Sequence, residues 1–158
     1  MELTLKGIKE TKEWEQAGIK LPSYDVKAVS DKARQNPRWA HFGIGNIFRI
    51  FLGGIADTLI EEGEMNEGIT CLETFDFDVV DKIYDPFDNL VLSVTLHKDG
   101  QRTKRVLGSL AEAVKLDKSA ASEQRLKEIF TSKSLQMVSF TITEKGYELR
   151  DANNTVFP

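Results

Sequence analysis

Two glycines separated by one residue, Gly43 and Gly45, have the clearest chemical use in this sequence. They follow the apolar run 39–42 and precede residues 46–62, in which apolar residues recur every three or four positions. This pattern is typical of a strand that turns into a helix. At such a turn one glycine can adopt backbone angles closed to other residues, and the other lets the main chain approach a pyrophosphate. The pattern therefore predicts a nucleotide phosphate site at the start of the helix.

Two charged side chains extend this predicted site. Arg49, in the first turns of the helix, can reach a phosphate or pair with the acidic segment that follows. Glu73 ends the next apolar run, 68–73, where a dinucleotide-binding fold places the acid that accepts the ribose hydroxyls. A carboxylate there favours NAD over NADP, because it repels a 2′-phosphate. The sixth position of the Gly-x-Gly-x-x-Gly pattern is Phe48, so a plain strand-to-helix turn is the alternative interpretation.

Composition limits the class of protein and its partners. The chain has 158 residues, of which 41% are hydrophobic and 29% charged, as in one soluble globular domain. A net charge of −4 argues against nucleic-acid binding through a basic surface. No apolar run approaches the ~18 to 20 residues of a membrane span, and the N-terminus lacks the features of a secretory signal. The single cysteine, Cys71, excludes an internal disulfide, so we expect a cytoplasmic protein.

The order of elements predicts an α/β protein with a Rossmann-like, three-layer fold, a mostly parallel sheet and an inserted β-hairpin. The predicted strands and helices are strand 38–43, helix 46–62, strand 68–73, helix 76–84, hairpin strands 90–96 and 103–107, helices 109–116 and 122–130, and strand 134–142. Asp99-Gly100 is the turn signal of the hairpin, and Ser122 is a plausible N-cap.

This count of elements leaves the predicted sheet short of strands. Three parallel strands are predicted, whereas a complete dinucleotide fold has six. We therefore expect an incomplete version of the fold in residues 37–158, with residues 1–36 as a lead-in that packs on it. Self-association or a missing C-terminal domain would cover the open edge of such a sheet.

Three segments resemble the long-chain polyol and aldonate dehydrogenases, also called the mannitol dehydrogenase family. They are residues 41–49, 73–83 and 138–147, the last being Val-Ser-Phe-Thr-Ile-Thr-Glu-Lys-Gly-Tyr. The resemblance implies an NAD-dependent oxidoreductase that moves a hydride between nicotinamide and an open-chain sugar acid or polyol, with D-mannonate and D-fructuronate preferred. It also brings Asn46 and Ile47 into the cofactor site, since they are similar to the Gly-x-Gly-Asn-Ile turn of related mannitol-1-phosphate dehydrogenases.

The resemblance also implies which residues this chain lacks. In the family a catalytic lysine, asparagine and histidine lie in a helical C-terminal domain. The two histidines here, His41 and His97, do not have that lysine and asparagine before them. We therefore expect the NAD-binding part of a larger dehydrogenase, without its catalytic residues.

The end of the last predicted strand completes the set of expected site residues. Thr143 and Glu144 follow its carboxyl end, the edge where α/β proteins bind ligands, and would lie near the nicotinamide. A polar turn is the alternative interpretation of these two residues. Two other functions stay open, namely a methyltransferase-like domain that binds S-adenosylmethionine and a non-catalytic nucleotide-binding module.

Overall fold

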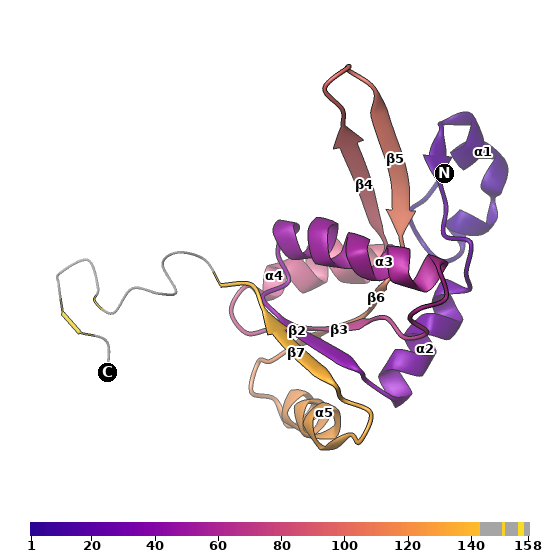
Figure 1. Ribbon diagram of the computed structural model, residues 1–158. Coiled ribbons are helices and arrows are strands. Elements are labelled where there is room, and N and C mark those ends of the chain that lie inside the picture. The colour runs from indigo at the N-terminus through magenta and orange to yellow at the C-terminus, as the bar shows by residue number, and fades with distance from the viewer. Residues whose placement is uncertain (143–149, 151–154, 157–158) are drawn as a thin grey trace.

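A four-stranded parallel sheet forms the centre of the computed structural model, which describes residues 1–142, 150, 155 and 156 (Figure 1). Its strand order is β6-β3-β2-β7, and each neighbouring pair is parallel. The strands are β2 (Trp39–Phe42), β3 (Ile69–Glu73), β6 (Leu110–Lys115) and β7 (Met137–Phe140). Dinucleotide-binding folds begin with this order, 3-2-1-4 in their own strand numbers. The predicted Rossmann-like fold is therefore confirmed.

Helices cover both faces of this sheet, as Figure 1 shows for α3 and α5. One face carries a continuous helical segment from 46 to 61 and the shorter helices that follow β3. These elements are the π-helical turn η2 (Phe48–Leu52), α3 (Gly53–Glu61), α4 (Phe77–Val79) and the π-helical turn η3 (Val80–Tyr84). The opposite face carries α2 (Val26–Gln35) and α5 (Ala120–Thr131), where Arg125 donates to the carbonyl oxygen of Arg34 at 2.9 Å.

The core divides into two clusters because neighbouring side chains of a strand point to opposite faces. Trp39 and Cys71 pack against Phe48 on the face of the helical segment 46–61. Ala40 and Leu72 pack against Ile129 of α5 on the other face. The apolar spacing that predicts the helix runs partly along its exposed side, since Phe51 is 63% and Ile55 43% exposed.

The segment predicted as a helix over 109–116 is instead the strand β6, so that prediction was wrong. Its apolar residues fit both periodicities over such a short run. Leu110 and Ala111 are buried, and the strand pairs with β3 from Ile69 to Glu73. Tertiary packing between β3 and α2 decides the conformation here. The parallel sheet consequently has four strands and not the three predicted.

The predicted hairpin is confirmed, and it belongs to a second, smaller sheet of order β1-β5-β4. Its strands are β1 (Ile19–Lys20), β4 (Val91–Leu96) and β5 (Arg102–Leu107), with β4 antiparallel and β1 parallel to β5. The lead-in thus contributes a strand as well as η1 (Gly7–Lys9) and α1 (Thr11–Gln16). The short helix η4 (Asp85–Phe87) precedes β4. Trp14, Ile19 and Val106 form the core beneath this sheet.

The N-cap of one helix differs from the sequence prediction. Ser119, and not Ser122, caps α5, because its hydroxyl accepts the amide of Ser122 at 3.2 Å. The helix approaches the sheet closely at Gly53, where a Cβ atom would be 3.3 Å from the side chain of Leu110. The Ser109 hydroxyl donates to the Gly53 carbonyl oxygen there at 2.7 Å. Among the described residues, no helix is both long and apolar enough to span a bilayer.

Candidate nucleotide-binding site

The glycine turn begins at the carboxyl end of β2, a central strand of the parallel sheet. Gly43 has φ of +85°, a conformation that side chains rarely allow. Its amide donates to the carbonyl oxygen of Leu72 at 3.2 Å, and a Cβ atom at Gly43 would lie 2.6 Å from the carbonyl oxygen of Thr141. The fold itself therefore requires glycine at this position.

Gly45 is in the opposite situation. Its two chain neighbours aside, a Cβ atom there would meet no atom of the described residues within 4 Å, and the residue is exposed. Its carbonyl oxygen accepts the amide of Arg49 at 3.0 Å and so begins the helical segment. Packing among the described residues therefore gives no reason for glycine at 45, which lies directly before the first helical turn.

The first turn of the helix presents main-chain donors next to a cation. Asn46 and Ile47 are exposed, with Ile47 at 72%. Amides in a first helical turn have no partner within the helix, so these groups are available to an anion. The Arg49 guanidinium donates to the Asn46 side-chain oxygen and lies 5.8 Å from the ring centre of Tyr84. The arrangement can hold a phosphate by hydrogen bonds and by charge.

Glu73 lies at the same edge of the sheet, at the end of β3, but its carboxylate already binds main-chain amides. Oε1 accepts the amides of Thr74, Phe75 and Asp76 at 3.0, 2.9 and 3.1 Å. Oε2 lies 3.4 Å from the amide of Ile44, in the glycine turn. Glu73 is 7% exposed. Because Oε1 already accepts three amides, Oε2 is the oxygen with acceptor capacity left for a ligand. The sequence did not indicate that Glu73 binds the main-chain amides of the loop that follows it.

Tyr84 is a residue of the site that the sequence analysis missed. Its hydroxyl donates to the carbonyl oxygen of Ile44 at 2.8 Å. Burial raises the pKa of the Tyr84 hydroxyl, which therefore stays protonated and serves as a donor. The available signal was a tyrosine on the apolar face of the helix after β3, because a buried tyrosine hydroxyl needs a partner.

His41 lies in β2, just before the glycine turn, and is fully buried. Its side chain links β2 to the neighbouring strand β7. Its Nδ1 and Nε2 atoms contact the hydroxyls of Ser139 at 2.7 Å and Thr141 at 2.9 Å. Its ring stacks on Phe48, with centroids 3.9 Å apart. Burial lowers the pKa of His41 to about 4, so the ring is neutral at pH 7. The residue is packed within the sheet and is not placed to act on a ligand.

The other expected residues lie elsewhere or are not described. Thr143 and Glu144 fall outside the described residues. His97 is exposed near the tip of the hairpin, where its Nε2 atom contacts the Thr103 hydroxyl at 2.7 Å. Cys71 is buried, and burial raises the pKa of its thiol, which makes it a poor nucleophile. Of the predicted site residues that the structure describes, the glycine turn, Arg49 and Glu73 thus lie together at one edge of the sheet.

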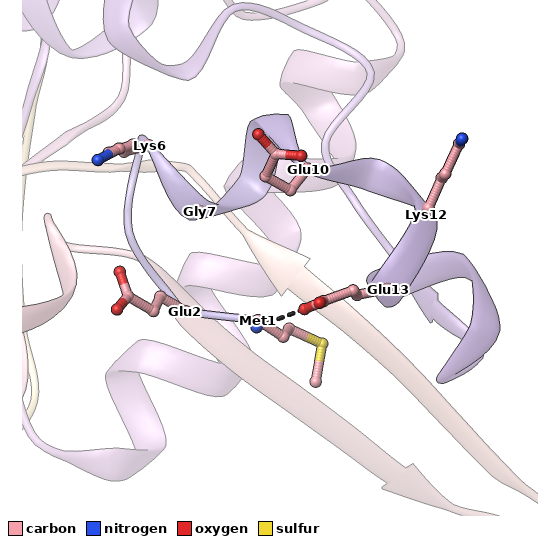
Figure 2. Close-up of a pocket in the computed structure, with 7 residues that line it drawn as sticks. All are labelled: Met1, Glu2, Lys6, Gly7, Glu10, Lys12 and Glu13. Carbon is pink, nitrogen blue, oxygen red and sulfur yellow. Dashed lines mark ion pairs between the residues drawn. The ribbon is translucent and has the colours of Figure 1, made fainter.

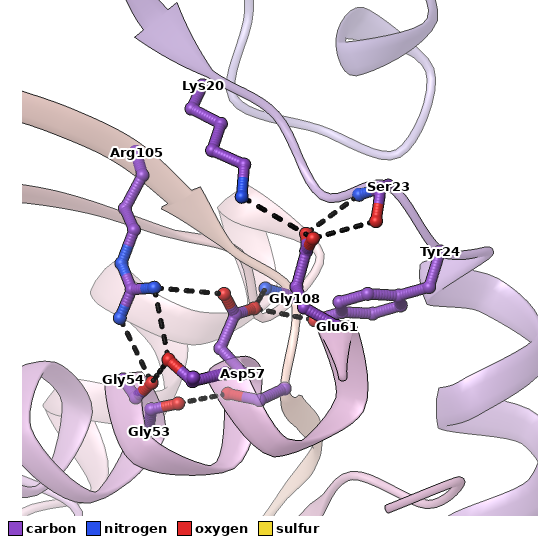
Figure 3. Close-up of polar contacts among 11 residues, drawn as sticks. Lys20, Ser23, Tyr24, Gly53, Gly54, Asp57, Glu61, Arg105 and Gly108 are labelled. Carbon is purple, nitrogen blue, oxygen red and sulfur yellow. Dashed lines mark hydrogen bonds and ion pairs between the residues drawn. The ribbon is translucent and has the colours of Figure 1, made fainter. Parts of the chain in front are cut away.

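A buried polar network fixes the far half of the helical segment (Figure 3). Asp57 is 2% exposed and accepts the Tyr24 hydroxyl at 2.6 Å and the Gly108 amide at 2.9 Å. Arg105 donates to the Gly54 carbonyl oxygen at 3.0 Å and lies 3.8 Å from Asp57. Burial raises the pKa of Asp57. These contacts join the second half of the helical segment to the lead-in and the small sheet, away from the glycine turn.

A separate cavity of about 560 Å³ lies among the first thirteen residues (Figure 2). Its lining mixes Lys6 and Lys12 with acidic side chains, and the N-terminal amine pairs with Glu13. None of the predicted site residues lines it. We therefore place the candidate site at the glycine turn and not in this cavity.

Comparison with known proteins supports the family resemblance seen in the sequence. No family model matches the chain. Over all 158 residues the chain is 44% identical to the D-mannonate oxidoreductase of Thermotoga maritima, of which it spans 29%. The similarity covers the N-terminal part of that relative, so the chain corresponds to less than a third of the relative's length.

Solved structures agree with this result. The chain is similar to Pseudomonas fluorescens mannitol 2-dehydrogenase, solved as a ternary complex with NAD and D-mannitol, with a TM-score of 0.75 and 25% identity. The match covers 99% of this chain and 30% of the dehydrogenase. A D-sorbitol dehydrogenase in substrate-free form matches with a TM-score of 0.73 and 21% identity, over 99% of this chain and 30% of its own, which shows the fold alone.

Proposed function

We propose, from its whole-length similarity to the N-terminal part of a D-mannonate oxidoreductase, that this chain is the NAD-binding part of a mannitol-family dehydrogenase. The substrate class is an open-chain sugar acid or polyol, and D-mannonate with D-fructuronate is the preferred pair. Bound NAD supplies the hydride chemistry, and the protein binds and orients it.

The observation that carries the proposal is the glycine turn on β2. It lies at the carboxyl edge of a parallel sheet whose strand order is that of dinucleotide-binding folds. The space at Gly45 suits a ligand, because none of residues 1–142 beyond its chain neighbours comes within 4 Å of it. A helix of this length with an exposed first turn adds a favourable dipole for a pyrophosphate.

Individual residues receive the following roles in the proposal. The amides of Gly45, Asn46 and Ile47 bind the pyrophosphate, Gly43 shapes the turn, and Arg49 adds positive charge. Glu73 accepts the adenosine ribose hydroxyls through Oε2, with the exposed Asp76 as the alternative acid. Thr143 and Glu144 are assigned to the nicotinamide side from the sequence alone.

The activity of the whole enzyme needs groups beyond those described here. No described histidine has the lysine and asparagine partners that the family resemblance implies. We therefore assign the proton-transferring residues to the part of the relatives that this chain does not span. The same proposal divides the chain into a lead-in, 1–36, and a cofactor-binding part, 37–158, in a cytoplasmic enzyme.

Calorimetric titration of the 158-residue chain with NADH and with S-adenosylmethionine tests the proposal. We expect saturable binding of NADH, weaker binding of NADPH because of Glu73, and no binding of S-adenosylmethionine. Binding of S-adenosylmethionine alone would assign the chain to the methyltransferase-like class. Binding of neither ligand would remove the cofactor proposal.

A further inference from the structure

Ile44, the residue between the two glycines, is contacted by a side chain at its carbonyl group and by another at its amide group. Ile44 is fully buried, and its carbonyl oxygen accepts the Tyr84 hydroxyl at 2.8 Å. Its amide faces Glu73 Oε2 at the longer distance of 3.4 Å. The Ile44 amide is therefore occupied, and the Tyr84 contact is the shorter of the two bonds.

The Tyr84 bond determines where the next amide points. The peptide unit that carries the Ile44 carbonyl also carries the amide N–H of Gly45, and its planar trans geometry sets the two groups in opposite directions. Since the Ile44 carbonyl points at Tyr84, the Gly45 N–H points away from it. Gly45 is exposed, and no atom of the described residues beyond its chain neighbours lies within 4 Å of the position that a Cβ atom would take there. Because the residue on the C-terminal side of this peptide unit is a glycine, the peptide unit would rotate more freely without the Tyr84 bond.

The surroundings of Tyr84 hold its hydroxyl in place. The residue is 1% exposed, ends the π-helical turn η3, and belongs to the same apolar cluster as Phe48 and Ile44. The Arg49 guanidinium lies 5.8 Å from the centre of its ring. One side chain thus contacts both the turn and the cation of the candidate site.

We propose that Tyr84 is a positioning residue that aims the Gly45 amide at the pyrophosphate of the cofactor. The proposal rests on the proposed NAD function for its ligand. The orientation of the Gly45 peptide unit can be tested without any ligand, so the two proposals can fail separately.

The first test is binding by Tyr84→Phe, which keeps the buried ring and removes the hydroxyl. We expect NADH and ADP-ribose to bind about three- to tenfold more weakly, as for the loss of one hydrogen bond. Adenosine has no pyrophosphate, so its affinity is expected to stay unchanged. A uniform loss for all three ligands would indicate general damage to the fold and overturn the positioning role, as would unchanged NADH affinity.

Tyr24→Phe is the matched control, because it removes a hydroxyl that donates to Asp57 in the distant network. We expect it to lower the melting temperature and to leave NADH affinity unchanged. Equal weakening of NADH binding in both variants would contradict a specific role for Tyr84.

The second test uses NMR relaxation of the unliganded chain. In Tyr84→Phe the Gly45 amide resonance is expected to show exchange broadening that the wild type and Tyr24→Phe lack. An unchanged Gly45 resonance would overturn the positioning role, whether or not NADH binds. Failure of wild-type NADH binding with a broadened Gly45 resonance would instead refute only the proposed cofactor.

Discussion

Gly45→Ala separates a requirement of the fold from a requirement of the ligand. Its chain neighbours aside, a methyl group at this position meets no atom within 4 Å in the part of the chain that the structure describes, and Gly45 does not have the positive φ found at Gly43. Alanine is a poorer N-cap than glycine by about 0.5–1 kcal/mol, whereas loss of unfolded-state entropy stabilises the variant by about 0.4–1 kcal/mol. The two effects oppose each other, so we expect the free energy of unfolding to change by less than about 0.5 kcal/mol.

Cofactor binding is expected to respond strongly to the same change. The added methyl group lies in the space where the pyrophosphate approaches the first helical turn. Loss of one amide–phosphate hydrogen bond costs about 1.5–3 kcal/mol, because one partner is charged. The Kd for NADH is therefore expected to rise about 10- to 150-fold.

Calorimetric titration with NADH and urea unfolding measure these two effects on the same protein samples. Gly54→Ala provides the matched control, since it makes the same substitution on the same helix, where the nearest atom to the new methyl group is the flexible end of Arg105, at 3.1 Å. We expect Gly54→Ala to leave NADH affinity unchanged. Wild-type affinity in a stably folded Gly45→Ala variant would refute the placement of the pyrophosphate at this turn.

Three further predictions concern the support of the turn. Gly43→Ala is expected to lower the free energy of unfolding by at least about 1–2 kcal/mol, because of its positive φ and a contact of 2.6 Å with a carbonyl oxygen; urea unfolding that matches the wild type would contradict this strain. Phe48 is buried and Phe51 is exposed, so Phe48→Ala is expected to lower the free energy of unfolding by about 3–5 kcal/mol and Phe51→Ala by less than about 0.5 kcal/mol. Equal losses in urea unfolding would show that the two helix faces are assigned wrongly. Burial lowers the pKa of His41 from 6.5 to about 4, so the unfolded chain binds a proton at this histidine more tightly than the folded chain does. We therefore expect the free energy of unfolding to fall by about 2–3 kcal/mol as the pH falls from 6.5 toward 4. Urea unfolding across this pH range should show a shallower pH dependence in His41→Gln but not in His97→Gln, and the same slope in all three proteins would argue against the neutral, buried ring.

Local patterns in the sequence were sufficient to predict the strand–turn–helix unit and the hairpin. The change from a two-residue to a 3.6-residue period across Gly43 and Gly45 marks the junction of β2 with the helix. The Asp99-Gly100 pair marks the hairpin, in which Gly100 has φ of +83°. Both signals are local, since they depend on backbone angles and side-chain periods within a few residues.

The remaining features depend on contacts between distant parts of the chain. The β6 segment carries two alanines and a leucine that suit a helix, and its pairing with β3 becomes visible only once the sheet is assembled. Tyr84 contacts Ile44 forty residues away, and no short motif links the two. The amides bound by Glu73 likewise became visible only in three dimensions, because a strand-end acid has the same pattern in both roles.

Phe48 occupies the place of the third glycine of the dinucleotide fingerprint, so the packing of this helix against its sheet differs from the usual one. The third glycine ordinarily lets helix and strand touch at the entrance of the site. Here that position holds a phenylalanine stacked on His41, and a helix glycine in close contact with the sheet occurs at Gly53, beyond a π-helical turn. A sequence search keyed to three regularly spaced glycines would overlook proteins built in this way, whereas one that allows an aromatic residue followed by a later glycine pair would find them.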